Sequence, residues 1–315
     1  MKILITGGAG FIGSHLCDVF LSKGHEVIAI DDLSLGRENN LLNAKKDHKF
    51  RFIKMNILEK NVLDKLFKDN RFDMVIHLAA NSDILAGTSD LRRDLNLNFL
   101  TTINILECMK DNNVKQIWFA STSAIYGEHE QKLSENSGPL FPISFYGASK
   151  LSAEGYITAY SHNFNIQAWI FRFPNVVGSR ATHGVIYNLF HQLKKNDSVL
   201  ELLGNGMQEK PYLHVSELIE AMNICFEKSK ESLNCFNIGC NSSTTVTKIG
   251  ELVIDRYGKH IPIKYAGGTR GWKGDVKKYL FDLSKIETLG WKAKLTSEDA
   301  IKKAVDEIYE EIIGL

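Results

Sequence analysis

A glycine-rich turn near the N-terminus constrains the fold of this chain more than any other feature. Residues 2–6 form an apolar run, as a strand buried in a parallel sheet requires, and four glycines follow at once within residues 7–13. Residues 14–23 then carry apolar side chains at helical spacing. Glycines let a backbone approach a pyrophosphate, and the N-terminus of the next helix offers unpaired N–H groups. The order strand, glycine turn, helix therefore predicts a dinucleotide-binding turn.

The end of the second predicted strand indicates which dinucleotide binds. Residues 26–30 form that strand, and Asp31 and Asp32 follow it. Asp31 stands near the spacing, roughly 20 residues after the last glycine, at which a carboxylate accepts a hydrogen bond from the adenosine ribose. A carboxylate there repels a 2′-phosphate, so the sequence predicts NAD rather than NADP. We interpret Arg37, the one residue here that would favour NADP, as a solvated loop charge.

Strands and helices alternate through the rest of the first half of the chain. The predicted strands are 50–55, 73–77, 115–120 and 166–171, and the predicted helices are 59–68 and 90–112. This alternation is typical of a doubly wound parallel sheet, which binds ligands at the carboxyl ends of its strands. Asn56, at one such end, either meets the adenine edge or only caps a turn. Asn98, in the long helix, is either ordinary surface or orients a catalytic lysine through water.

Composition and charge exclude several classes of function. The chain has 315 residues, with 38 basic and 37 acidic side chains and a net charge of +1, which argues against a nucleic-acid partner. Glycines interrupt the first apolar run, so we predict neither a signal peptide nor a membrane span. The five cysteines are scattered and form no CxxC pair. We therefore expect reduced thiols, no metal site and a cytoplasmic location.

Tyr146 and Lys150 lie four residues apart in a predicted helix, within the sequence Tyr-Gly-Ala-Ser-Lys. Residues four apart share one helix face, with about 5–6 Å between their Cβ atoms. An ammonium beside a phenol favours the phenolate, so we expect the pKa of Tyr146 to fall from its usual value near 10. A tyrosine with a lowered pKa can take a proton from a sugar hydroxyl and later return it.

Five motifs in order give the chain a resemblance to a known family: GGAGFIG, HLAA, STSAIYG, YGASK and RFPN. The chain resembles the extended short-chain dehydrogenases/reductases, specifically their NAD-dependent nucleotide-sugar epimerase/dehydratase branch. The resemblance implies a doubly wound Rossmann domain, a smaller C-terminal α/β domain that binds the nucleotide-sugar, and the catalytic set Thr122, Tyr146 and Lys150. The implied cofactor contacts are Gly7, Gly10, Phe11, Ile12, Gly13, Asp31, Asp32, Asn56, Ile57, Leu78, Ala79, Ala80, Asn98, Ser121, Tyr146, Lys150 and Phe173.

The two residues after Thr122 distinguish the members of this branch. Dehydratases carry an Asp-Glu pair there, and the related decarboxylases carry a Glu second, whereas this chain has Ser123 and Ala124. Removal of water needs such an acid, but the hydride shuttle of a 4-epimerase does not. The sequence is therefore most similar to UDP-glucose (UDP-galactose) 4-epimerases. The alternatives are another nucleotide-sugar enzyme, such as a 4,6-dehydratase or a C4 dehydrogenase, and a non-catalytic NAD-binding regulator.

The C-terminal part of the chain departs from the family in its cationic residues. Lys210 replaces the usual arginine of an Arg-Asp-Tyr run and would grip a diphosphate less specifically. The usual Arg-Pro-Gly-Asp run is shifted, so either Arg270 or Lys273 inherits its phosphate contact, and we favour Arg270. Trp272 either stacks on a base or packs at a domain seam. The expected substrate contacts are Asn81, Ser123, Asn175, Lys210, Tyr212 and Arg270.

The expected organisation is two domains built from interleaved segments. The cofactor domain comprises residues 1–172, with 213–240 returning to it, and the substrate domain comprises 173–212 and 241–315. The resemblance also implies a homodimer, in which helices corresponding to 90–112 and 145–163 pair across a two-fold axis. The expected partner is thus a nucleoside-diphosphate sugar and a second copy of the chain, with no nucleic acid and no membrane.

Overall fold

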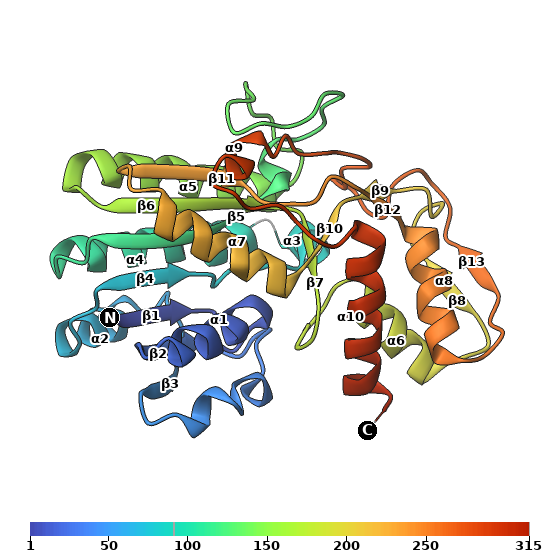
Figure 1. Ribbon diagram of the computed structural model, residues 1–315, viewed down its shortest axis with the longest axis horizontal. Coiled ribbons are helices and arrows are strands. Elements are labelled where there is room, and N and C mark those ends of the chain that lie inside the picture. The colour runs from blue at the N-terminus through green and yellow to red at the C-terminus, as the bar shows by residue number, and fades with distance from the viewer. Residues whose placement is uncertain (91, 315) are drawn as a thin grey trace. The chain divides into compact units, whose positions relative to one another are not determined.

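The computed structural model describes residues 1–90 and 92–314 and divides them into two compact units (Figure 1). Unit 1 comprises Met1–Thr122, Phe145–Arg172 and Cys225–Phe236. Unit 2 comprises Ser123–Ser144, Phe173–Ile224 and the chain from Asn237 onward. Each unit is described here by itself, because each has its own core.

Unit 1 is organised around a seven-stranded parallel sheet with the strand order β11-β6-β5-β4-β1-β2-β3 (Figure 1). The strands are β1 (Lys2–Thr6), β2 (Glu26–Asp31), β3 (Phe50–Lys54), β4 (Met74–His77), β5 (Gln116–Thr122), β6 (Gln167–Phe173) and β11 (Leu233–Asn237). Ile3 pairs with Val27 of β2 on one side and with Met74 of β4 on the other. The strand order reverses at β1, so the crevice beside β1 and β4 is where such a sheet binds its ligand. The predicted Rossmann fold is confirmed.

Helices cover both faces of this sheet. On one face, α2 (Lys60–Asp69), α4 (Thr101–Asp111) and α5 (Phe145–Phe164) share an apolar core with the strands. On the other face, α1 (Phe11–Ser22) buries Phe20 against Trp118, with 5.5 Å between ring centroids. Burial of apolar side chains on both faces explains why the strands read as continuous apolar runs. The short elements of the unit are η1 (Glu38–Leu41), η2 (Ala44–Lys46) and α3 (Ile84–Ser89).

The helix predicted at 90–112 is not one regular helix. A π-helical turn, η3 (Leu95–Leu100), precedes α4. The wider turn places Asn98 inward, where its side chain is only 1% exposed, and the Thr102 hydroxyl donates to the Asn98 carbonyl over 2.7 Å. Turns of this kind occur frequently at functional sites. Periodicity did not predict the irregularity, because the contacts that favour it come from other elements of unit 1.

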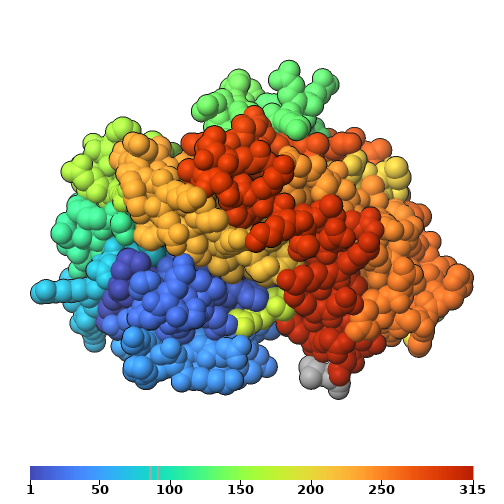
Figure 2. Space-filling view, viewed as in Figure 1, coloured from blue at the N-terminus to red at the C-terminus, as the bar shows by residue number. Residues whose placement is uncertain are grey.

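Unit 2 packs three helices around its own apolar core. These are α6 (Val185–Lys195), α8 (Val246–Tyr257) and α10 (Ser297–Ile312), and α8 lies beside α10 in Figure 2. Arg256 of α8 ties the two helices together, because its Nε lies 2.8 Å from Asp306 and its guanidinium 3.8 Å from the Tyr309 ring. The other elements are η4 (Ser123–Ile125), β7 (Asn175–Val177), β8 (Leu200–Leu202), β9 (Glu209–Lys210), β10 (Tyr212–His214), β12 (Thr244–Thr245), β13 (Ile263–Tyr265) and α9 (Ser284–Glu287). Helix α7 (Val215–Lys228) begins in this unit, and its last turn belongs to unit 1.

The unit boundaries differ from the predicted domains at two places. The predicted break after residue 172 is also a unit boundary, but 123–144 belongs to unit 2, where Tyr126 donates to Asn237 over 2.7 Å. The segment that returns to unit 1 is 225–236 rather than 213–240. This segment begins just before Phe226, whose ring packs on both Trp118 and Trp169 of unit 1.

Candidate active site

The glycine turn leaves no room for side chains. Gly7 has a φ of +67°, and a Cβ there would lie 2.8 Å from the Ala79 nitrogen. A Cβ on Gly13 would lie 2.2 Å from the Gly7 carbonyl oxygen. Gly10 precedes α1, which begins with Phe11 and Ile12 at the predicted cofactor positions. The turn therefore holds bare backbone at a helix N-terminus, which fits a pyrophosphate.

Asp31 is fixed at the end of β2 by backbone N–H groups. Its carboxylate accepts from Ala9 N over 3.1 Å and from Leu33 N over 2.8 Å. Burial raises the pKa of Asp31, while these bonds oppose that rise. A Cβ on Gly36 would lie 2.7 Å from the carboxylate, so the loop passes close over it. Asp32 instead caps its own loop by accepting from Ser34 N over 2.9 Å.

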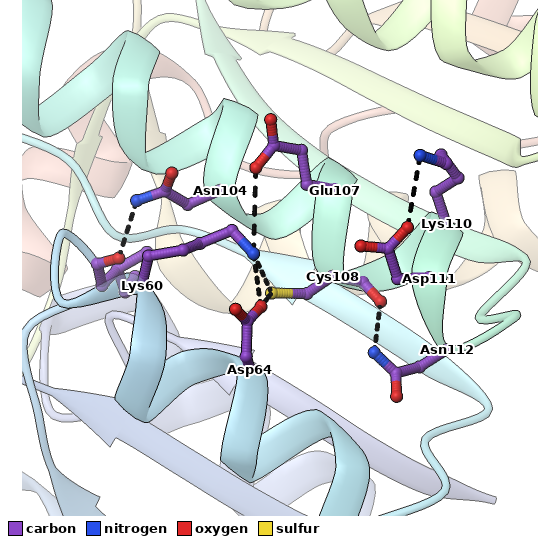
Figure 3. A network of polar contacts seen from close by, with 9 residues as sticks. Lys60, Asp64, Asn104, Glu107, Cys108, Lys110, Asp111 and Asn112 are labelled. Atoms are coloured by element: carbon purple, nitrogen blue, oxygen red, sulfur yellow. Dashed lines mark hydrogen bonds and ion pairs between the residues drawn. The ribbon is translucent and has the colours of Figure 1, made fainter.

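The loop at Asn56 and Ile57 is held by α4. The Asn56 side-chain oxygen accepts from Leu58 N over 2.9 Å, as a turn cap does. Asn104, labelled in Figure 3, donates from Nδ2 to the Ile57 carbonyl over 3.0 Å. Beside this contact, Figure 3 shows Lys60, Asp64 and Cys108 joining α2 to α4. Burial and the neighbouring carboxylate raise the pKa of the Cys108 thiol to about 12.

A buried histidine holds the small-residue loop Leu78, Ala79 and Ala80 beside the glycine turn. Thr102 donates its hydroxyl proton to Asn98, so it must accept from His77 Nε2–H, 3.0 Å away. His77 Nδ1 is then the acceptor for the Thr6 hydroxyl over 2.7 Å. The Thr6 oxygen accepts in turn from the N–H groups of Leu78 and Ala79 over 3.2 and 3.1 Å. Burial lowers the pKa of His77 to about 3, so the ring is neutral.

The catalytic candidates converge at the end of β5. The Tyr146 hydroxyl is hydrogen-bonded to Thr122, and Lys150 Nζ donates to the Ala120 carbonyl over 2.9 Å. Lys150 is 2% exposed, and burial lowers its pKa to about 7. Burial also raises the pKa of Tyr146 to about 12, so the lowered pKa predicted from the sequence is wrong for the protein alone. The penalty for burying a phenolate outweighs the hydrogen bond with Thr122, which lowers the pKa of Tyr146.

Asn98 reaches the catalytic helix through Ser149. Its Nδ2 donates to Ser149 Oγ over 3.0 Å, and that hydroxyl donates to the Tyr146 carbonyl over 2.8 Å. Asn98 Oδ1 accepts from the backbone N–H of Asn81 over 2.7 Å. Asp94 accepts from the side-chain amides of Asn81 and Asn98 over 2.8 and 3.1 Å. The network thus links the predicted substrate residue Asn81 to the turn of α5 that carries Tyr146.

Five predicted substrate residues lie in unit 2, and two of them contact a tyrosine that the sequence did not single out. Ser123 and the backbone N–H of Asn175 are hydrogen-bonded to the Tyr279 hydroxyl. The Asn175 side chain is hydrogen-bonded to the Tyr212 hydroxyl, opposite it in the β7–β10 pair. Burial raises the pKa of both phenols, so both are neutral. Phe173, predicted at the cofactor, also belongs to unit 2.

Lys210 and Arg270 are brought together by Asp275. The carboxylate of Asp275 pairs with Lys210, and its carbonyl accepts from Arg270 Nη1 over 2.7 Å. Arg270 also lies 2.9 Å from Glu128, and Lys210 lies 5.0 Å from the Trp272 ring centroid. Both predicted diphosphate cations are therefore paired with acidic or carbonyl groups of unit 2.

The sequence did not single out Glu154, which lies among the catalytic candidates. It stands four residues after Lys150, so helical spacing was the available signal. Its carboxylate accepts from Ser121, a predicted cofactor contact, and from Arg172. No group of three or more His, Cys, Asp or Glu side chains suited to a metal occurs among residues 1–90 and 92–314. Nor does any helix of that part of the chain have the length and apolar character to cross a bilayer.

Comparison with known proteins assigns the chain to a family. The model of the NAD dependent epimerase/dehydratase family matches residues 3–239. The chain belongs to this family. It is an extended short-chain dehydrogenase/reductase that acts as an enzyme on nucleotide-sugars, with NAD as its cofactor. The glycine turn and Asp31 are the residues that would hold NAD, and they fit it.

Solved relatives include more than one activity. A UDP-glucose 4-epimerase from Thermotoga maritima, solved with UDP-glucose, is 30% identical with a TM-score of 0.87, over 99% of each chain. A UDP-glucuronic acid 4-epimerase from Bacillus cereus, solved with UDP-glucuronic acid and NAD, is 29% identical with a TM-score of 0.88, over 99% of this chain and 100% of that one. A dTDP-glucose 4,6-dehydratase from Bacillus anthracis, solved with NAD, is 26% identical with a TM-score of 0.85, over 100% and 98%.

Proposed function

We propose that this family member is a nucleotide-sugar 4-epimerase of the UDP-glucose/UDP-galactose type. One observation carries the proposal: Tyr146 is hydrogen-bonded to Thr122, and Lys150 is buried one helix turn after Tyr146, while Thr122 is followed by Ser123 and Ala124. The site thus has a proton-transfer group for a sugar 4-hydroxyl, but neither position beside Thr122 holds the acid that elimination requires. Asp94 is nearby, but it is 1% exposed and held by two amides.

The residues of unit 1 have distinct roles in the proposed reaction. Bound NAD supplies the acceptor and donor of the C4 hydride. Tyr146 takes the proton of the sugar 4-OH and returns it after the 4-keto sugar has presented its other face. Thr122 orients the hydroxyl through its bond to Tyr146. Lys150, as a cation, stabilises the phenolate, because a nearby positive charge favours the ionised form. Asn98 and Ser149 fix the helix turn that carries Tyr146.

The predicted substrate residues of unit 2 extend the proposal to the nucleotide. Ser123 and Asn175 present polar groups whose partners, Tyr279 and Tyr212, stay neutral. Lys210 and Arg270 are the proposed diphosphate cations. For Arg270 the planar guanidinium matches a phosphate in two bonds, whereas Lys210 acts as a point charge. Both would have to exchange or share their present partners, Asp275 and Glu128, to bind a diphosphate.

A panel of nucleotide-sugars tests this function. The purified protein is incubated with UDP-, GDP-, dTDP- and CDP-hexoses, and the products are identified by their stereochemistry at C4. We expect interconversion of UDP-glucose and UDP-galactose with no net change in NADH absorbance. Net consumption of NAD would instead indicate a C4 dehydrogenase, and a 4-keto-6-deoxy product would indicate a dehydratase. Binding of NAD with no turnover of any sugar would indicate a regulator.

We also propose that the protein is a cytoplasmic homodimer that pairs through η3, α4 and α5. Exposed apolar side chains gather on this part of unit 1. The Phe99 ring of η3 contacts the Tyr156 ring of α5, with 5.0 Å between ring centroids. The exposed members are Leu95, Leu100, Phe145, Tyr156 and Phe164. A cluster of this kind marks an interaction surface. The five cysteines, all within the described residues, form no disulfide, which is consistent with a reducing compartment.

Charge placed on this surface should separate the two copies. We expect the unaltered protein to sediment as a dimer and a Leu100→Glu/Tyr156→Glu variant to sediment as a monomer, because an interface cannot bury two unpaired carboxylates. Val62 is an equally exposed apolar residue on α2, so Val62→Glu is the matched control and should remain dimeric. A monomeric unaltered protein at micromolar concentration would contradict the proposal.

A further inference from the structure

Three successive turns of α5 are each tied to one of three consecutive residues at the end of β5. Tyr146 is hydrogen-bonded to Thr122, and Lys150 Nζ donates to the Ala120 carbonyl over 2.9 Å. One turn further, Glu154 accepts from the Ser121 hydroxyl. The first two ties involve the catalytic candidates. The third lies between them on the strand and has no part in the proposed chemistry.

Glu154 is locked by a second strand. Arg172, on β6, donates from Nε to Oε1 of Glu154 over 3.0 Å and from Nη2 to Oε2 over 2.6 Å. Glu154 is 5% exposed and Arg172 is 7% exposed. A bidentate hydrogen bond between a buried guanidinium and a carboxylate fixes the orientation of the carboxylate as well as its distance. The carboxylate is therefore a rigid anchor for Ser121.

This anchor lies next to the two groups that hold the catalytic lysine. Ser121 follows Ala120 directly, so a bond that fixes Ser121 also fixes the carbonyl that accepts from Lys150. Glu154 is also one helix turn from Lys150, where opposite charges attract. Because Lys150 is buried, its cation needs nearby negative charge, and Glu154 contributes more of it than Asp94 does.

We propose that Glu154, locked by Arg172, is a positioning residue that holds the Ala120–Ser121 end of β5 beneath Lys150 and keeps this lysine protonated. The inference rests on the proposed function only in the role given to Lys150. The titratable groups that interact with Lys150 are Glu154 on α5, Asp94 before η3 and His77 on β4. Tyr146 stands one helix turn before it on α5. The Phe119 ring, 4.7 Å from Nζ, completes its surroundings on β5.

Titration of Lys150 tests the proposal without substrate. The lysine signal is followed by NMR in protein labelled at lysine and is assigned with Lys150→Arg. In Glu154→Gln we expect its pKa to fall by about 1 unit, because a negative neighbour is lost and Arg172 is left uncompensated. The alkaline limb of the kcat–pH profile should shift to lower pH by the same amount, with KM unchanged. Glu227→Gln removes a surface carboxylate paired with Lys23 and should shift neither.

A second variant separates positioning from charge and from folding. Ser121→Ala keeps the Glu154–Arg172 pair and removes only the tie to β5, so it should fold even if Glu154→Gln does not. Loss of one hydrogen bond of about 1 kcal/mol should lower kcat about five-fold. Because Ser121 is also a predicted cofactor contact, kcat is measured at saturating NAD. Unchanged kcat in Ser121→Ala overturns the positioning role, and an unchanged Lys150 pKa in folded Glu154→Gln overturns the electrostatic one. If the protein proves not to be an epimerase, the Lys150 titration still decides the inference.

Discussion

Replacing Tyr146 with phenylalanine is expected to lower turnover at least ~100-fold, the lower end for loss of one proton-transfer group. The ring packs as before, so the protein should fold and bind NAD. Only the hydroxyl that is bonded to Thr122 is lost. The measurement is kcat for UDP-galactose, together with the NAD content of the purified variant. Because the missing group acts on the transition state, the loss should fall on kcat rather than on KM.

A tyrosine elsewhere on the same helix provides the control. Tyr160 is half-buried on α5 and its ring contacts that of Phe164 in a tilted arrangement, with 5.0 Å between ring centroids. Tyr160→Phe should therefore keep full activity. Equal turnover by Tyr146→Phe and the unaltered protein would remove the proton-transfer role. A rise in KM with kcat unchanged would instead indicate that Tyr146 binds the substrate.

The pH dependence of the reaction should depend on the charge around Tyr146. Burial raises the pKa of Tyr146 to about 12 and lowers that of Lys150 to about 7. Both shifts oppose the phenolate–ammonium pair that the chemistry needs. The negative charges of Glu154 and Asp94 favour the lysine cation, and the positive charge of bound NAD favours the phenolate. In the proposed mechanism the active ionisation state therefore depends on these surrounding charges and is not a property of the Tyr-Lys spacing alone.

The parts of the fold that the sequence predicted are those that local patterns determine. The apolar run 2–6 and the glycine turn became β1 and the loop before α1. Asp31 ends β2, and Tyr146 and Lys150 share a helix, as their spacing predicted. The roles of the individual site residues remain predictions.

The parts that the sequence did not predict depend on contacts between distant segments. The π-helical turn at Asn98 is accompanied by bonds to Asn81 and Ser149, and no local pattern shows them. Glu154 had a helical spacing to Lys150, but its partner Arg172 comes from another strand. The direction of the Tyr146 pKa shift depends on burial, which only the packed structure reveals. Spacing predicted which groups are neighbours, and packing decided how they behave.

Acid should destabilise this protein through His77. Burial lowers the pKa of His77 in the folded protein to about 3, whereas the unfolded chain binds the proton near the usual histidine pKa of 6.5. The contribution of neutral His77 to the free energy of unfolding is therefore fully present above pH 6.5 and is lost as the pH falls toward 3. The difference corresponds to about 5 kcal/mol of unfolding free energy at 1.36 kcal/mol per unit. Urea unfolding measured at several pH values between these limits gives the slope of the unfolding free energy against pH.

Comparison of variants isolates the histidine from carboxyl groups that titrate in the same range. His77→Gln keeps a donor and an acceptor for Thr102 and Thr6 but cannot be protonated, so its unfolding free energy should fall less steeply below pH 6.5. His48 has a side chain that is 88% exposed, so His48→Gln should keep the unaltered slope. Equal slopes for His77→Gln and the unaltered protein would show that His77 accepts a proton in the folded state. The Thr6 hydroxyl would then have lost its acceptor, and the loop at Leu78 and Ala79 could not depend on a neutral ring for its position.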